Sequence, residues 1–452
     1  MVPGLFRRLG GFGQHMTARD TQLVALSELV SDKTGILRRM HRRATSADEP
    51  PIPIIYDAML SNFDFKKGSD LERGACGKGL TETSAQIGAI GEAVEHYCAS
   101  HARTRLARRA KSGDLDRAIP PTDFVLYSEA QYARDGFRYA RWTPDVEIAW
   151  FQVRELGTDA LVWVPAGLVY LNFTGQKPAD FLCPPTSSGS AAGPNLNYAI
   201  LRGLLEIVER DAFTITWMNR LPVPELDYSG LGGPCGIVRD HYARNGVQAR
   251  AFLLATDLPV YAVMAIGVDR TGKGPAAVVG LGCDLDAEIA LRKALFEVCQ
   301  VRPAERKKFL SGDAEKATSY SDVHTLDEHA LYFVRQDHLH ELDFLLESSS
   351  SVRVSTLPDL GSGSVEGDLE KMRVALTGIG SRALYVDVTT PDLDEFPIRV
   401  VRTLATHLQP IAFGHDEQRL GGQRLYELPQ RLGYGTEVRT ERGLNPCPHP
   451  IA

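Results

Sequence analysis

The stretch that most constrains this chain runs from Asn195 to Phe213 and reads NLNYAILRGLLEIVERDAF. Its apolar residues recur at helical spacing, which predicts an amphipathic helix; they are Leu201, Leu204, Leu205, Val208 and Ala212. Glu206, Glu209 and Arg210 lie three and four residues apart, so they project together from one side of this helix. The side chain of Asn195 is expected to cap its first turn.

A second stretch, GKGLTETSAQIGAIGEAVEHY, has the same arrangement. A glycine-rich turn around Lys78 is expected to lead into a helix that carries Glu92 and Glu95, with Thr81 or Thr83 as the cap. Two Glu-x-x-Glu helices could bring four carboxylates into one pocket, where divalent metal or basic groups would have to neutralise them. The alternative is two amphipathic helices with solvated acidic faces, and the spacing alone leaves both open.

A third helix is predicted in DAEIALRKALFEVCQVRPAERKK, residues 286–308, with Lys293, Glu297 and Gln300 at positions i, i+4 and i+7 and with Arg302 and Arg306 near its end. These arginines could meet phosphate oxygens as a fork, or they could simply complement the helix C-terminus. The segment 184–195, PPTSSGSAAGPN, is a small-residue loop that enters the central helix. Loops of this composition let backbone amides approach a phosphate closely.

The remaining segments give a coarser prediction. Strands are expected at 124–127 and in several apolar runs between 147 and 283, whereas the polar segment 311–367 is expected to form flexible loops or an insertion. Residues 1–20 are expected to be a loose N-terminal arm. The C-terminal tail 446–452 alternates prolines, which stiffens it and indicates a specific position.

Composition excludes several classes of function. The 452 residues carry a formal net charge of −7 and a pI of about 6.0, which argues against nucleic acid or an anionic membrane as partner. No window approaches eighteen uninterrupted apolar residues. The seven cysteines contain no Cys-x-x-Cys pair, so we expect reduced thiols in the cytoplasm rather than disulfides or a zinc site.

Taken in order, these stretches resemble the YcaO family. The first block is GKG-x12-E-x2-E, the second is SGSAAGPN followed by GLLEIVERDAF, and the third is ALFEVCQVR. YVDVTTPDL and SDKTGI also match, so the resemblance extends from about residue 25 to the C-terminus. The ending PCPHP is similar to the Pro-x-Pro-x-Pro tail of the azoline-forming branch, whose members include stand-alone proteins of thiazole- and oxazole-modified peptide biosynthesis.

The resemblance implies an α+β fold, in which mixed β-sheets are faced by the three motif helices, and one YcaO domain over residues 21–452. It also implies an ATP- and Mg2+-dependent cyclodehydratase. In such an enzyme a Cys, Ser or Thr side chain of a ribosomal precursor peptide attacks the preceding amide carbonyl. ATP phosphorylates the resulting oxygen, and phosphate leaves to give a thiazoline or oxazoline.

The resemblance also assigns residues. Magnesium ligands are Glu92, Glu95, Glu206 and Glu209. The same glutamates belong to the ATP site together with Lys78, Ser188, Asn195, Arg210, Glu297, Gln300 and Arg302. The residues implied in catalysis are Arg210, Pro446, Pro448 and Pro450, the prolines by placing the tail near the site.

Three positions depart from the family pattern: Gly88, Ser188 and Tyr198 stand where the family commonly has Ser, Asn and an acidic residue. They support an alternative function, a docking scaffold that has lost catalysis. Another alternative keeps ATP but forms thioamides or amidines; the proline tail argues against it.

Partners follow from the same resemblance. Beyond the precursor peptide, we expect a separate leader-binding protein of the ubiquitin-activating-enzyme-like or winged-helix type. A flavin-dependent azoline dehydrogenase would be a further, separable partner. The chain is expected to form a homodimer within a synthetase complex.

Overall fold

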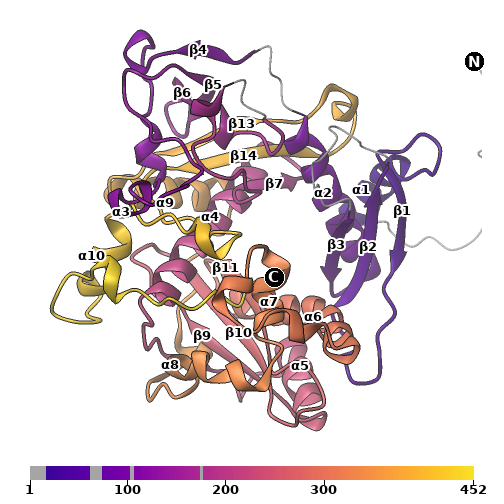
Figure 1. Ribbon diagram of the computed structural model, residues 1–452. Helices are drawn as coiled ribbons and strands as arrows, with labels where there is room; N and C mark the ends of the chain where they lie inside the picture. Colours follow the sequence, from indigo (N-terminus) through magenta and orange to yellow (C-terminus); the bar gives the residue numbers. More distant parts are fainter. Residues whose placement is uncertain (1–16, 62–73, 102–105, 174–176) are drawn as a thin grey trace, which may run out of the picture.

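The computed structural model describes residues 17–61, 74–101, 106–173 and 177–452. These residues form three β-sheets interleaved with helices, which confirms the predicted α+β class. Figure 1 shows the first sheet at the right of the view, the third at the top and the second at the bottom. The central helix lies between the last two.

The first sheet has the order β1-β2-β3 and is antiparallel. Its strands are β1 (Leu37–Arg42), β2 (Ile54–Leu60) and β3 (Gly74–Gly79), and it packs with α1 (Ala18–Leu26) and α2 (Glu82–Ser100). The glycine-rich segment expected as a turn is therefore strand β3. It lies directly against α2: a Cβ on Gly77 would sit 2.0 Å from the Ala85 carbonyl oxygen. Only glycine lets the two backbones approach this closely.

The second sheet has the order β11-β10-β9-β8-β12. Its strands are β8 (Glu225–Asp227), β9 (Val247–Leu253), β10 (Tyr261–Asp269), β11 (Ala277–Asp284) and β12 (Ser351–Arg353). Every residue of β10 is buried, because both faces of this strand are covered. Met264 and Ile266 pack in the core with α4 (Leu196–Met218). Val263 and Ala265 pack with α5 (Gly233–Arg244) and α6 (Ala287–Ser311).

The third sheet has the order β4-β5-β13-β14-β7, with β6 on β5. Its strands are β4 (Arg108–Ala110), β5 (Ile148–Glu155), β6 (Leu161–Pro165), β7 (Ser190–Gly193), β13 (Ala383–Asp387) and β14 (Arg399–Ala405). Val401 of β14 shares a core with α4, whereas Val400 shares one with α2. Two of the motif helices are therefore fixed against this sheet.

The three motif helices begin where the sequence predicts. Asn195 caps α4 by accepting from the Tyr198 amide at 2.9 Å, and Thr81, one of the two candidates, caps α2. Asp286 caps α6. A side-chain oxygen in each case satisfies an amide of the first turn that has no partner within the helix.

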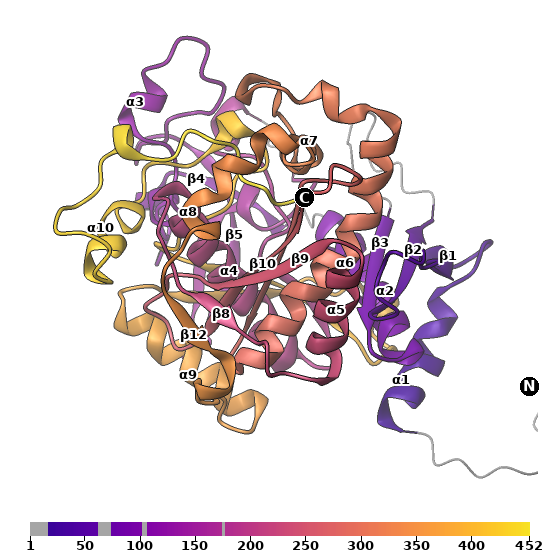
Figure 2. The ribbon, with the colours of Figure 1, turned by 90° about the horizontal axis from the view of Figure 1, so that it is seen from below.

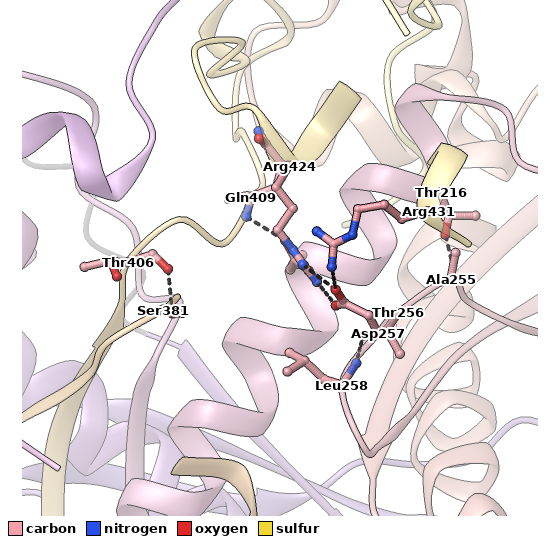
Figure 3. A network of polar contacts seen from close by, with 11 residues as sticks. Thr216, Ala255, Thr256, Asp257, Leu258, Ser381, Thr406, Gln409, Arg424 and Arg431 are labelled. Atoms are coloured by element: carbon pink, nitrogen blue, oxygen red, sulfur yellow. Dashed lines mark hydrogen bonds and ion pairs between the residues drawn. The ribbon is translucent and has the colours of Figure 1, made fainter. Parts of the chain in front are cut away.

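An ion-pair cluster fastens α10 (Arg424–Arg431) to α4. Arg424 Nε donates to both carboxylate oxygens of Asp211 at 3.0 Å. Arg424 and Arg431 also both reach Asp257, at 2.5 and 2.6 Å (Figure 3). Asp211 is fully buried, so the residue that follows Arg210 in α4 has its charge paired within the fold.

Some sequence expectations are wrong. Residues 124–127 form no strand, since a 3-10 turn ends at Phe124 and Val125 has a φ of 55°. The segment 311–367 holds regular elements rather than loops alone: α7 (Leu326–Tyr332), α8 (Asp343–Leu346), β12 and the start of α9 (Val365–Gly378). A third of the small-residue loop, four of its twelve residues, is strand β7 (Ser190–Gly193). Residues 1–16 of the expected arm lie outside the described residues, but α1 begins at Ala18.

Candidate functional site

A cavity of about 750 Å3 lies where the three motif helices meet β3, β7 and β11. Many of the sequence-predicted site residues line it: Lys78, Glu92, Glu95, Glu206, Glu209, Arg210, Glu297 and Gln300. They come from α2, α4, α6 and β3, elements far apart in sequence. The structure thus brings both Glu-x-x-Glu pairs to one pocket, which rules out two independent, fully solvated faces. Its volume is in the range of small-molecule and cofactor sites.

Two of the carboxylates in the cavity have raised pKa values. Burial raises the pKa of Glu95 well above its ordinary value, and the negative charges of Glu206 and Glu92 raise it further. Burial likewise raises the pKa of Glu209 to about 7, with Glu297 and Glu206 adding to the rise and Arg210 opposing it. Like charges held this close disfavour ionisation, so a cation in the cavity would relieve their repulsion.

Basic side chains share the same cavity. Arg210 lies 3.6 Å from Glu206 and 3.8 Å from Glu209, distances too long for strong hydrogen bonds. Lys78 is 3.7 Å from Glu297. These loose pairs leave the cations able to turn toward an anionic ligand.

Further arginine and lysine side chains line the cavity, namely Arg19, Arg202 and Lys293. Of these, the sequence singled out Lys293, by its helical spacing to Glu297 and Gln300. Lys293 donates to Asp284 and to the Cys283 carbonyl, and Arg202 lies 3.8 Å from Asp284. Burial, followed by the positive charge of Arg202, lowers the pKa of Lys293 to about 8. Helical spacing could have identified Arg202 as well, because it precedes the lining Glu206 by four residues.

Other predicted residues lie elsewhere. Asn195 is exposed and only caps α4. Ser187 rather than Ser188 lines the large cavity, and Ser188 lines a smaller neighbouring one. Arg302 is buried outside the lining, where its guanidinium pairs with Glu49 and lies 3.7 Å from Asp269. Its charge is therefore already compensated within the fold.

The proline tail passes through the core to the cavity. Cys447, His449 and Ile451 are buried, and Ala452 lines the cavity although Pro446, Pro448 and Pro450 do not. In Figures 1 and 2 the C-terminus lies inside the outline of the ribbon. The tail is thus placed specifically, as its stiffness predicts.

Side chains and backbone both hold this tail. Trp217 Nε1 of α4 donates to the Cys447 carbonyl at 3.1 Å. His449 Nε2 lies 2.6 Å from the Ala412 carbonyl and Nδ1 is 3.3 Å from the Ile451 amide. These partners suit a neutral imidazole that donates from Nε2 and accepts at Nδ1.

The glutamates of the cavity suit a magnesium ion that is bound by few protein ligands. Within the described residues, no three Asp, Glu, His or Cys side chains form a preformed metal cage. Mg2+ usually takes one or two carboxylates and completes its shell with water and substrate phosphates. The separated pairs Glu92 and Glu95, and Glu206 and Glu209, suit such open binding.

No described helix combines the length and apolarity needed to cross a membrane.

Comparison with solved structures finds a heterocyclase in complex with substrate and cofactor, with a TM-score of 0.82 and 25% identity over 96% of this chain. The heterocyclase TruD aligns with a TM-score of 0.66 and 24% identity over 82% of this chain. This chain covers 58% and 52% of those two proteins.

YcaO from Methanopyrus kandleri, bound with AMPPCP and Mg2+, aligns with a TM-score of 0.64 at 21% identity over 89% of this chain and 94% of that one. At this identity the likeness, as with TruD, shows a shared fold.

Sequence comparison agrees. An uncharacterised protein of Methanothermobacter thermautotrophicus is 27% identical over 353 residues, which are 76% of this chain and 83% of that protein. Another, from the region 3′ of tfuA in Rhizobium leguminosarum bv. trifolii, is 30% identical over 240 residues, 50% of this chain and 54% of that one. The model of the family described as YcaO cyclodehydratase, ATP- and Mg2+-binding, matches residues 76–409. The chain belongs to the YcaO family.

Proposed function

We propose that this chain is an ATP-dependent cyclodehydratase that converts Cys, Ser or Thr residues of a ribosomal precursor peptide into azolines. The side-chain sulfur or oxygen attacks the preceding amide carbonyl, and the former amide oxygen leaves as phosphate. Each ring costs the peptide one water, while ATP becomes ADP and phosphate. Amide oxygen is a poor leaving group, so phosphoryl transfer is what makes this step feasible.

One observation carries the proposal: acidic and basic groups from three helices converge in one cavity that the C-terminal tail also reaches. A triphosphate needs both kinds of group, since cations face its oxygens and carboxylates hold its metal. Two helices with solvated acidic faces would not require these side chains to meet in one cavity or to be buried there.

The roles divide by element. Glu92 and Glu95 of α2 and Glu206 and Glu209 of α4 are the groups that would hold Mg2+. When bound, the ion would neutralise phosphate charge during transfer.

The cations face the phosphates of the nucleotide: Lys78, Arg202, Arg210 and Lys293. Glu297 and Gln300 of α6 lie on the same wall of the cavity. Because Arg302 is already paired with Glu49, we assign it to supporting α6 rather than to contacting phosphate. Ser188 and Asn195 are likewise not retained as nucleotide contacts.

The glutamates also shape the cavity. Glu206 Oε2 accepts from the Gly189 amide at 3.1 Å, which ties the loop before β7 to α4. We propose that the tail prolines act indirectly: they fix the course of the buried residues and so bring Ala452 to the cavity wall.

The functional domain extends on both sides of the matched region. Arg19, Gln22 and Leu26 of α1 line the cavity, as does Ala452, although all lie outside residues 76–409. We therefore propose a single YcaO domain across residues 21–452. We propose that residues 18–20 belong to this domain as well, because they are part of α1, which begins at Ala18.

Partners remain part of the proposal. A leader-binding protein of the ubiquitin-activating-enzyme-like or winged-helix type would present the peptide, a flavin-dependent dehydrogenase would oxidise azolines, and two copies would pair within the complex. The E. coli microcin synthetase McbBCD, a multiprotein complex, shares the fold with a TM-score of 0.57 at 16% identity. All seven cysteines are free thiols, which suits a reducing cytoplasm.

The test combines the protein, ATP, Mg2+, the precursor peptide encoded nearby and its leader-binding partner. Intact mass should fall by about 18 Da per ring, the mass of one water, together with release of phosphate. A gain of about 16 Da when sulfide is supplied, oxygen replaced by sulfur, would indicate thioamide formation instead. Absence of nucleotide binding would favour the docking scaffold.

The matched variants are Glu206→Gln and Glu288→Gln. The first keeps an acceptor for the Gly189 amide but removes a charge from the cavity, and it should abolish ring formation while the protein stays folded. Glu288 is exposed at the start of α6, so its variant should remain active. A folded, active Glu206→Gln would refute the site assignment.

A further inference from the structure

A second cavity, of about 70 Å3, shares Arg210 with the large one. It is bounded by the loop 183–188, α4, β14 and the segment 408–410, and Arg402 and Arg419 also line it. No Asp or Glu is among its lining residues. Its lining therefore carries three arginines and no acidic side chain, unlike the neighbouring cavity, whose lining mixes glutamates with basic side chains.

Two of these arginines are buried without an acidic partner. Arg402 and Arg419 are 5% and 7% exposed, and neither forms an ion pair with another described residue. Arg402 donates to the Leu168 carbonyl at 3.0 Å and to Ser190 Oγ at 3.2 Å. Among the described residues, the guanidinium of Arg419 donates to the Cys183 sulfur at 3.6 Å.

The positive charge here is incompletely balanced. Burial lowers the pKa of Arg402 to about 10; the charge of Glu206 opposes this shift, Arg419 adds to it, and Glu95 opposes it to a lesser extent. Nη1 of Arg210 is buried without a hydrogen bond among the described residues, although it lies 3.8 Å from Glu209 on the side of the large cavity. Buried cations are costly unless they are paired and hydrogen-bonded, so an anion in this cavity would supply the missing partner.

Size and geometry select the class of anion. The cavity offers several times the roughly 10–15 Å3 that one water requires, which suits a tetrahedral group of four oxygens. Guanidinium forks match phosphate oxygens in pairs. Arg210 connects this cavity to the one in which phosphate would be released.

We propose that the small cavity is a binding site for inorganic phosphate, distinct from the positions of the nucleotide phosphates. Its role as a station for the phosphate product rests on the proposed cyclodehydratase function; the anion site itself rests on the three arginines. Phosphate held there would leave the nucleotide cavity free for exchange of ADP and ATP.

The experiment is equilibrium dialysis of the full-length protein with radiolabelled orthophosphate, with and without saturating AMPPCP and Mg2+. We expect one phosphate per chain that the nucleotide analogue does not displace. Arg419→Gln should weaken phosphate binding at least tenfold, since a charged hydrogen-bonded partner is lost. Arg353→Gln, a control at an exposed arginine paired with Asp227, should leave it unchanged.

Two results would overturn the inference: displacement of phosphate by AMPPCP, which would place it in the nucleotide's own site, or no phosphate binding at all. Should Arg419→Gln fail to fold, Arg419→Lys keeps the charge without the fork, and the competition experiment on the unaltered protein still decides. Ring formation without phosphate binding refutes only this site. Phosphate binding without ring formation leaves the site in place and refutes the proposed function.

Discussion

Replacing Gly77 by alanine tests how the positions of the α2 carboxylates depend on strand β3. A Cβ at this position would lie 2.0 Å from the Ala85 carbonyl oxygen and 2.1 Å from the Ala89 nitrogen. Both are backbone atoms of α2 and cannot rotate away. Ordinary contact begins at 3.4 Å, so α2 would have to move by about 1.4 Å at this point (3.4 − 2.0).

This displacement should affect both stability and activity. Overpacking of this kind typically costs about 1–3 kcal/mol, which would lower the melting temperature. Glu92 and Glu95 follow on the same helix and would shift with it. Because a misplacement of about 1 Å can cost about 100-fold in rate, we expect ring formation to fall by roughly that factor in Gly77→Ala.

The matched control is Gly74→Ala, in the same strand, where a Cβ would meet nothing within 4 Å. Melting temperature and initial rates of ring formation, measured for both variants, separate a close backbone contact from a general effect on the strand. If Gly77→Ala melts and reacts like Gly74→Ala, the reasoning about the β3–α2 contact is refuted.

Two further predictions concern stability. Arg424→Met should cost about 3–5 kcal/mol in denaturant unfolding, because fully buried Asp211 loses its cation; Arg431→Met, at an exposed arginine, should cost less than about 1 kcal/mol, and equal costs would contradict this. Burial lowers the pKa of His449 to about 4, so between this pH and about 6.5 the unfolded chain binds more protons and stability falls on acidification. His449→Gln should reduce that acid dependence, by up to about 3 kcal/mol, in melting curves recorded across this range; an unchanged pH dependence would contradict it.

Helical periodicity and capping residues predicted the scaffold of the site well. The start of α4 after Asn195 and the shared faces of its glutamates follow from local rules that need no tertiary information. The predicted family and fold class are confirmed, and the family description includes ATP and Mg2+. The order of the three motifs identified the family, and the structure shows why they occur together: each motif lies on a different helix that lines the same cavity.

The same geometry explains the misplaced arginine. Residues five apart on an α-helix lie about 140° from each other around its axis, so Arg302 points away from the face that carries Glu297. Val301 and Lys293, each four residues from Glu297, do line the cavity. Applying helical spacing more strictly would have kept Lys293, which the sequence already groups with Glu297, and excluded Arg302.

One further helix had a local signal that its polar surroundings obscured, whereas the course of a loop depends on tertiary packing. The segment 311–367 is polar, yet Thr325 and Glu328 form a capping box that starts α7, and apolar residues such as Leu331 reach the main core. The path of the loop at 187–189 requires a φ of 87° at Gly189. This path determines that Ser187 lines the large cavity and Ser188 the small one. The composition of the loop does not predict this difference.

The distribution of charge around α4 links the two cavities to the stability of the fold. Asp211 turns one buried side of the helix toward Arg424 and is paired there. Arg210, its neighbour, lies between a cavity rich in carboxylates and one lined only by arginines among its charged residues. Buried charges that serve only stability are usually paired in the folded chain, as Asp211 is; buried charges left unbalanced on both sides of Arg210 instead favour charged ligands as their partners. A cation would stabilise the first cavity and an anion the second, with Arg210 in contact with both.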